Sequence, residues 1–222
     1  MVDFTALPPA AQARQLGLPE GEVGIDIGLR MNRTNRAGNV AAVDRLELAP
    51  GHAVLEIGPG NGRLLPDLMA RAAGLRYLGI DISPTMVAEA RAFNAARIAM
   101  GEAAFELAEA TAIPAADASF DRALAVNVIY FWPDPVVQLR EIRRVLAPGG
   151  RLVVASTTPE TARAMPAMRA EFGLVTRTAE ELTALHREAD FTEVSVDVMR
   201  DTVPRPDGTP WEVTAFLVVA RV

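Results

Sequence analysis

The residues best suited to chemistry are concentrated in one short segment, where Glu56 is followed by three glycines, Gly58, Gly60 and Gly62. The apolar residues before Glu56 predict a buried strand, and the sequence from Arg63 onward predicts the start of a helix. Glycine adopts positive φ and lets a ligand approach the backbone closely. A strand, a glycine turn and a helix N-terminus direct free N–H groups at a ligand. The segment therefore indicates a site for a cofactor that carries adenosine.

The spacing of these glycines differs from that of a dinucleotide site. Such a site reads G-x-G-x-x-G, whereas this chain reads G-x-G-x-G and has Arg63 where the third glycine would fall. Glu56 would repel a pyrophosphate, and it suits a ligand that carries positive charge and amino groups. An ordinary turn between a strand and a helix, without any ligand, is the alternative interpretation of this segment alone.

Four later segments extend the pattern. The first segment resembles the first motif of the class I S-adenosylmethionine-dependent methyltransferases, and the later ones resemble further motifs of that family in the same order. These later segments are residues 75–81, 109–114, 120–127 and 144–152. The likeness is strongest over residues 50–156, and within the family it is greatest to enzymes that methylate small molecules, including quinone-type precursors.

The resemblance implies an α/β fold: a doubly wound, Rossmann-like sheet of seven mostly parallel strands that ends in an antiparallel C-terminal hairpin. It also implies transfer of a methyl group from S-adenosyl-L-methionine to a small, moderately apolar metabolite, on oxygen or carbon rather than nitrogen. Two alternatives stay open: an NAD(P)-dependent oxidoreductase, and a regulatory protein that binds the cofactor without catalysis.

The cofactor contacts also follow from the resemblance. Asp81 would accept hydrogen bonds from both ribose hydroxyls, and Glu56 would anchor the loop or lie near the cofactor's ammonium group. Glu109 would read the adenine edge, while Met86 would pack on the ring or be an ordinary core methionine. The residues expected at the cofactor are Glu56, Gly58, Gly60, Asn61, Gly62, Asp81, Ile82, Met86, Glu109, Ala110, Thr111 and Asn127.

The acceptor side has weaker signals. Asn127 to Tyr130 superficially resembles the Asn-Pro-Pro-Tyr signature of enzymes that methylate amino groups in nucleic acids, but both prolines are missing. Tyr130 and His186 are candidate catalytic residues, and a structural role is the alternative for each. Residues 22–39 and 159–173 are expected to form a lid. The residues expected at the acceptor are Met31, Tyr130, Trp132, Met165 and Met168.

The remaining elements are expected from periodicity and capping. Helices are predicted over residues 39–48, from 64 to Gly74, from Pro84 to about residue 100, and over 178–189, where Thr178 and Glu181 form a capping box. Strands are predicted over residues 103–108 and 152–155. The strands at 191–199 and 211–219 should pair antiparallel, because the ten-residue loop 201–210 is too short for a parallel crossover.

Composition narrows the class of protein. The chain has 222 residues, half of them hydrophobic, a net charge of −6 and no cysteine. Disulfides, thiolate metal sites and a thiol nucleophile are excluded, no bound metal is expected, and a nucleic-acid partner is disfavoured. No apolar run reaches the length of a membrane span. We expect a cytoplasmic monomer or homodimer that acts on a small molecule, with residues 1–38 as an N-terminal arm and lid and 39–222 as the methyltransferase domain.

Overall fold

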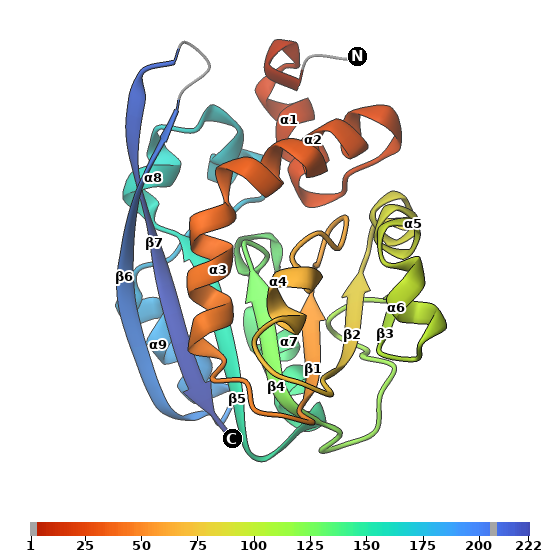
Figure 1. Cartoon of the computed structure of the whole chain (residues 1–222). Helices are drawn as coiled ribbons and strands as arrows, with labels where there is room; N and C mark the ends of the chain where they lie inside the picture. The colour runs from red at the N-terminus through yellow and green to blue at the C-terminus, as the bar shows by residue number, and fades with distance from the viewer. Residues whose placement is uncertain (1–3, 205–207) are drawn as a thin grey trace.

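The strands form one twisted sheet at the centre of the molecule (Figure 1). The computed structural model describes residues 4–204 and 208–222. Among these residues the sheet has seven strands in the order β3-β2-β1-β4-β5-β7-β6. The first five in chain order pair in parallel and β7 is antiparallel to both of its neighbours, so the expected fold class is confirmed. The strands are β1 Ala53–Ile57, β2 Arg76–Asp81, β3 Ala103–Leu107, β4 Phe120–Val126, β5 Leu146–Thr157, β6 Thr192–Pro204 and β7 Pro210–Arg221.

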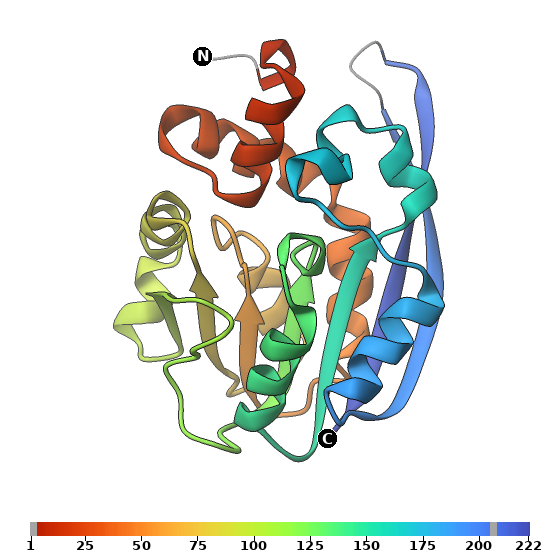
Figure 2. The same ribbon diagram turned by 180° about the vertical axis from the view of Figure 1, so that it is seen from behind.

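Helices cover both faces of this sheet, because successive side chains of a buried strand point to opposite faces. Val54 packs in the core on the side of α3, α4 and α5, whereas Leu55 packs on the side of α7 and α9. Figure 1 shows the first side in front, and Figure 2 shows the second. The bounds of these helices are α3 Arg36–Arg45, α4 Leu65–Met69, α5 Pro84–Phe93, α7 Pro135–Val145 and α9 Ala179–Glu188.

Two predicted helices are shorter than expected. The helix after Pro84 was expected to reach about residue 100, but it is interrupted at Asn94 and resumes as α6, Ala95–Ala99. The side-chain amide of Asn94 donates to the carbonyls of Ala90 and Gly62, which ties the end of α5 to the glycine loop. The helix expected to run to Gly74 is α4, which ends at Met69. The chain then turns, and the carbonyl of Ala73 accepts a hydrogen bond from the Gly51 N–H before β2 begins.

Other boundaries also differ. The helix expected over residues 39–48 is α3, which begins and ends three residues earlier, with Leu46 as its C-cap. The strand expected over 152–155 is the much longer β5, because Leu146 already pairs with Phe120 before an irregularity in the β4 pairing. The strand expected over 103–108 ends one residue earlier, as β3.

The capping box and the antiparallel pairing of the last two strands are confirmed, although β6 continues to Pro204, beyond its expected end at 199. The Thr178 backbone N–H donates to the Glu181 carboxylate, and the Glu181 N–H donates to the Thr178 hydroxyl, which completes the capping box of α9. Strands β6 and β7 pair antiparallel from Thr192 opposite Arg221 to Pro204 opposite Pro210. Residues 205–207 of the intervening loop lie outside the described residues.

The N-terminal segment lies over the carboxyl ends of the parallel strands (Figure 1). A short turn of 3-10 helix, η1 Phe4–Ala6, precedes α1, Pro9–Gly17, and residues 1–3 lie outside the described residues. The next helix is α2, Gly21–Thr34, in which Ile27 and Gly28 are buried. After β5 come α8 Pro159–Arg163, η3 Pro166–Met168 and η4 Ala170–Phe172.

No helix in the described part of the chain is both long enough and apolar enough to cross a membrane.

Candidate cofactor and acceptor site

The glycine loop joins β1 to α4 in a conformation that only glycine adopts without strain. Gly58, Gly60 and Gly62 have φ values of +69°, +56° and +69°. The Gly58 N–H donates to the Ile80 carbonyl at 2.8 Å, and an added Cβ at Gly58 would lie 2.4 Å from Cγ1 of Val128. An added Cβ at Gly60 would meet no atom within 4 Å, so this glycine leaves room for a ligand.

Gly62 has a different role from the one expected. It does not line a cavity, because it faces α5: an added Cβ would lie 2.9 Å from Cβ of Ala90 and 2.7 Å from the side-chain nitrogen of Asn94. The third glycine therefore lets the loop pack closely against α5.

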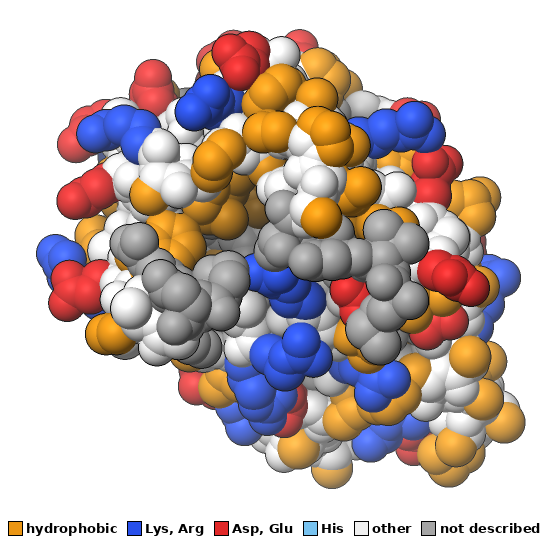
Figure 3. Space-filling view, turned by 90° about the horizontal axis from the view of Figure 1, so that it is seen from above, with side chains coloured by type: hydrophobic (Ala, Val, Ile, Leu, Met, Phe, Trp, Pro, Cys, Tyr) orange, Lys and Arg blue, Asp and Glu red, His pale blue; other side chains and the backbone are white. Residues whose placement is uncertain are grey.

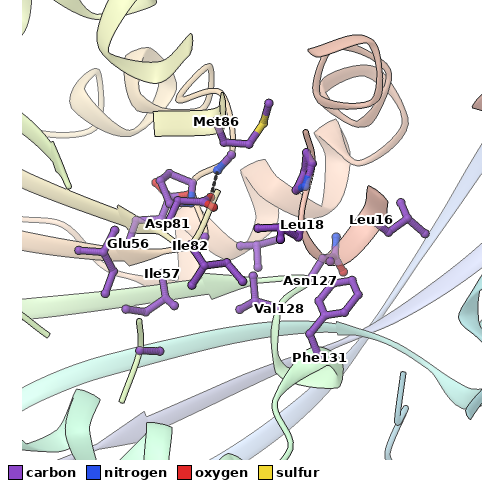
Figure 4. Close-up of a pocket in the computed structure, with 18 of the residues that line it drawn as sticks. Leu16, Leu18, Glu56, Ile57, Asp81, Ile82, Met86, Asn127, Val128 and Phe131 are labelled. Carbon is purple, nitrogen blue, oxygen red and sulfur yellow. Dashed lines mark hydrogen bonds between the residues drawn. The ribbon is translucent and has the colours of Figure 1, made fainter. Parts of the chain in front are cut away.

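Asp81 ends β2, the strand beside β1, and its carboxylate holds the loop in place. One oxygen accepts from the Gly60 N–H at 3.0 Å, and the other accepts from the Ser83 N–H at 2.9 Å. Burial raises the pKa of Asp81, and the backbone hydrogen bonds from Ser83, Gly60 and Ile82 oppose that rise. The two carboxylate oxygens offer about four acceptor positions in all. Asp81 therefore keeps acceptor capacity at the wall of the cavity (Figure 4).

Glu56 is the second acidic residue of the site. It is 3% exposed, and the hydroxyl of Tyr77 donates to its carboxylate at 2.6 Å. Burial raises the pKa of Glu56 to about 7, while the hydrogen bond from Tyr77 lowers it. The Glu56 carboxyl thus exchanges a proton near neutral pH, and a nearby positive charge would favour its ionised form.

A cavity of about 610 Å³ lies at the carboxyl ends of β1, β2 and β4. Every residue expected at the cofactor lines it except Gly62. Ile82 is 49% exposed although it is a large apolar side chain at the cavity wall. Figure 4 shows Asp81 and Ile82 on one side of this cavity and Leu16 and Leu18 on the other. Further lining residues outside the set expected at the cofactor are Leu16, Leu18, Gly28, Asn32, Asn39, Ile57, Leu64, Val128, Phe131 and Gln138, of which Gly28, Asn32 and Asn39 belong to the expected lid.

The N-terminal helices close the cavity from above. Gly28 of α2 is close enough to Asn61 that an added Cβ would lie 3.0 Å from the Asn61 side-chain nitrogen. The amide of Asn32, one turn further along α2, donates to the Asn61 side-chain oxygen at 3.1 Å. The hydroxyl of Ser83 donates to the Pro19 carbonyl in the α1–α2 connection. These contacts fix α2 directly on the glycine loop.

A second cavity of about 440 Å³ adjoins the first. Four residues line both: Leu16, Met31, Asn35 and Asn127. The second cavity contains three of the side chains expected at the acceptor in addition to Met31, namely Tyr130, Met165 and Met168. Apolar residues of α2 and of the β6–β7 hairpin complete its wall: Ile27, Met199, Val203, Trp211 and Val213.

Polar groups gather where the two cavities meet. Asn127 has a left-handed φ of +57°, and its side-chain oxygen accepts from the hydroxyl of Thr157 at 3.5 Å. The Tyr130 hydroxyl is hydrogen-bonded to Thr157, and burial raises the pKa of Tyr130 well above its usual range. Tyr130 is therefore a neutral phenol at physiological pH.

Two residues expected at the acceptor or the reaction do not line the second cavity. Trp132 lines the first cavity and not the second. His186 lines neither cavity, because it lies on the buried face of α9, where its Nδ1 contacts the Leu182 carbonyl at 2.7 Å. Burial lowers the pKa of His186 to about 4. The structure thus assigns His186 to the core and not to the reaction.

The surface above the cavities is mixed in character. Seen from above, hydrophobic side chains are gathered on part of this face, and charged side chains of both signs surround them (Figure 3).

Three features define a Rossmann-like methyltransferase fold. They are the order of the strands in the sheet, the antiparallel final strands, and the glycine loop beside Asp81 at the end of β2. Residues 55–154 match the family model described as a methyltransferase domain, so this segment of the chain is a methyltransferase domain and the resemblance found in the sequence is confirmed.

The similar proteins agree with this result. An O-methyltransferase of Aspergillus sclerotiorum is 31% identical over 164 residues, which cover 72% of this chain and 62% of that protein. The demethylmenaquinone methyltransferase of Thermus thermophilus is 39% identical over 137 residues, which cover 61% of this chain and 58% of that protein. The chain therefore spans about three fifths of the length of these two relatives. An S-adenosylmethionine-dependent methyltransferase from Thermotoga maritima, a possible histamine N-methyltransferase, has the same fold. The superposition of the two structures has a TM-score of 0.66 at 24% sequence identity, and it covers 89% of this chain and 95% of that chain.

Proposed function

We propose that this protein transfers a methyl group from S-adenosyl-L-methionine to a small, moderately apolar metabolite, on oxygen or carbon. The observation that carries the proposal is the pair of adjoining cavities that share Met31 and Asn127. One has the polar groups of a nucleoside site, and the other has the apolar wall of an acceptor site. A methyl group at their junction would face both.

The residues of the first cavity fit this cofactor. Asp81 keeps acceptor capacity for the ribose hydroxyls, and Gly60 leaves space beside the loop backbone. Glu56 would balance the ammonium group, and the exposed apolar surface of Ile82 would pack on the adenine ring. The methyl carbon on the sulfonium of this cofactor is electrophilic, so for an acceptor that binds as its anion the chain needs only to bind, align and shield the reactants.

The second cavity would bind the acceptor and orient it towards the methyl group. Its methionine side chains adapt to the shape of an apolar ligand. The neutral phenol of Tyr130 would orient the acceptor through its hydroxyl oxygen and hold the nucleophilic atom towards Asn127, rather than remove a proton. Oriented reactants reach effective molarities of about 10⁵–10⁸ M, so positioning alone can account for a large acceleration.

The N-terminal residues 1–38 would act as the lid over both cavities, together with residues 159–173. Leu16 and Met31 line both cavities, and Gly17 packs so closely on Phe131 that an added Cβ would lie 3.1 Å from its ring. The close fit of α1 and α2 supports a cover that excludes water from the reacting atoms.

The test is transfer of a labelled methyl group from S-adenosylmethionine into a panel of phenols, enols and quinone precursors. Ala164 lines the second cavity and is exposed, so Ala164→Trp should fill that cavity without disturbing the core. We expect this variant to bind S-adenosylhomocysteine normally and to lose at least about tenfold in transfer rate. Its neighbour Arg163 is also exposed and lines neither cavity, so Arg163→Trp is the matched control.

Two other results would contradict the proposal. Binding of the cofactor without transfer to any acceptor would indicate a regulatory protein. Hydride transfer with NAD(P)H would indicate an oxidoreductase, although Glu56 beside the loop and the antiparallel β7 disfavour that class.

A further inference from the structure

The structure leaves one buried polar atom unpartnered at the first cavity. Among the described residues, the side-chain oxygen of Gln138 is buried without a hydrogen-bond partner, and Gln138 lines this cavity. Gln138 as a whole is only 7% exposed. An unpaired buried carbonyl is costly, and such atoms in folded proteins need an explanation.

The position of Gln138 on α7 identifies the part of the cavity that it faces. Gln138, Glu141 and Arg144 are three residues apart and share one side of the helix. Glu141 accepts a hydrogen bond from the Ile113 N–H at 2.8 Å, and Arg144 donates to the Ile113 carbonyl at 3.2 Å. These two side chains fix the loop after β3 against α7. Gln138 lies one turn earlier, towards the part of that loop that contains Ala110 and Thr111, which also line the cavity.

The chemistry of an amide suits this end of the cavity. Ala110 is buried and offers only backbone groups, and Glu109 is exposed at the rim, where it accepts from the Thr111 hydroxyl. An amide has an acceptor and a donor side by side, and adenine presents an amino group beside a ring nitrogen, which is why glutamine recognises adenine edges. The loop backbone and Gln138 would therefore face the base together.

We propose that Gln138 reads the adenine of the cofactor by accepting a hydrogen bond from the 6-amino group. This inference rests on the proposed function, because it assumes that the first cavity holds the adenosine of S-adenosylmethionine. It adds a specificity-determining residue that the sequence motifs do not mark. In this role, the buried oxygen of Gln138 gains its partner when the cofactor binds.

The test compares two ligands and three proteins by isothermal titration calorimetry. The ligands are S-adenosylhomocysteine and its purine analogue, in which hydrogen replaces the 6-amino group. The proteins are the full chain, Gln138→Met, and a control, Val137→Ala, which alters the exposed side of the same helical turn. Methionine has nearly the shape of glutamine and cannot accept a strong hydrogen bond.

We expect the unaltered protein and Val137→Ala to prefer S-adenosylhomocysteine by about tenfold or more. Gln138→Met should bind S-adenosylhomocysteine about tenfold more weakly, and its preference should fall to about threefold or less. Its melting temperature without ligand should stay equal or rise, because the substitution removes an unpaired buried oxygen.

Each contrary result has a distinct meaning. A preference in Gln138→Met within about twofold of that of the unaltered protein would overturn the role of Gln138. A lower melting temperature with unchanged preference would indicate a purely structural glutamine and would also overturn it. Failure of the unaltered protein to bind either ligand would contradict the proposed function itself.

Discussion

The hydroxyl of Tyr77 on β2 donates a hydrogen bond to the carboxylate of Glu56 on the adjacent strand β1, at a distance of 2.6 Å. Both side chains are buried, so this contact places an acid with a pKa of about 7 at the wall of the larger cavity. Tyr77 itself stays protonated, because burial and the negative charge of Glu56 raise its pKa. The pair therefore makes the folded protein sensitive to pH.

Glu56 should destabilise the fold as pH rises. Its pKa is raised from 4.5 to about 7 in the folded protein, so between these pH values the unfolded chain loses a proton that the folded chain keeps. The free energy of unfolding should therefore fall by up to roughly 3 kcal/mol from pH 4.5 to 7 through this group. Glu56→Gln should remove that fall, which urea titrations at several pH values would detect.

His186 should act in the opposite direction. Its pKa is lowered from 6.5 to about 4, so the unfolded chain takes up a proton as pH falls through this range, and the folded chain does not. The free energy of unfolding should fall by up to roughly 3 kcal/mol from pH 6.5 to 4 through this group. His186→Leu should remove this loss and leave methyl transfer unchanged; a large loss of transfer would restore His186 as a catalytic candidate.

The two effects oppose each other where their pH ranges overlap. Stability of Glu56→Gln should therefore rise from pH 5 to 6.5, and stability of His186→Leu should fall over the same range. Identical pH profiles for the two variants would contradict both assignments.

Binding of the cofactor should also depend on pH. An ammonium group near Glu56 favours the ionised carboxylate, so affinity for S-adenosylhomocysteine should fall below pH 7, by up to about tenfold per pH unit. Tyr77→Phe removes a hydrogen bond that lowers the pKa of Glu56, and it should shift this dependence to higher pH. Calorimetry at pH 6 and 8 would measure both effects, and an affinity independent of pH would exclude the contact with the ammonium group.

The loop glycines should differ in their tolerance of a side chain. Gly58→Ala introduces a Cβ 2.4 Å from Val128 as well as a strained φ, whereas Gly60→Ala introduces only the strained φ. Gly60→Ala should cost about 1–2 kcal/mol of stability, and Gly58→Ala should cost more. The double variant Gly58→Ala/Val128→Ala should recover part of that additional loss in thermal denaturation. If both single variants were equally stable, the contact with Val128 would not constrain the loop.

Local patterns in the sequence predict much of this fold. The glycines after Glu56, the acid at the end of β2 and the capping box at Thr178 each place an element where the structure has it. These signals depend on residues close together in the chain. Boundaries set by distant contacts were predicted poorly, such as the break at Asn94, which depends on the carbonyl of Gly62 in another segment.

In the candidate site too, residues marked by local patterns could be predicted, and residues brought in by distant contacts could not. The residues expected at the cofactor lie in loops that follow recognisable strands, and all of them except Gly62 line the first cavity. Leu16, Leu18 and Gly28 reach the site from α1 and α2, and no local pattern indicates where those helices pack. Gln138 looks like an ordinary helical residue, and only its buried unpaired oxygen marks it.

The most direct test of the account is calorimetric titration of S-adenosylhomocysteine into the unaltered protein and Asp81→Asn. Asp81 would hold the ribose, whereas Asp67 pairs with Arg36 at the surface, so Asp67→Asn is the control. We predict one binding site in the unaltered protein and in the control, and affinity weaker by about tenfold or more in Asp81→Asn. No binding to the unaltered protein, or equal affinity in Asp81→Asn, would contradict the account.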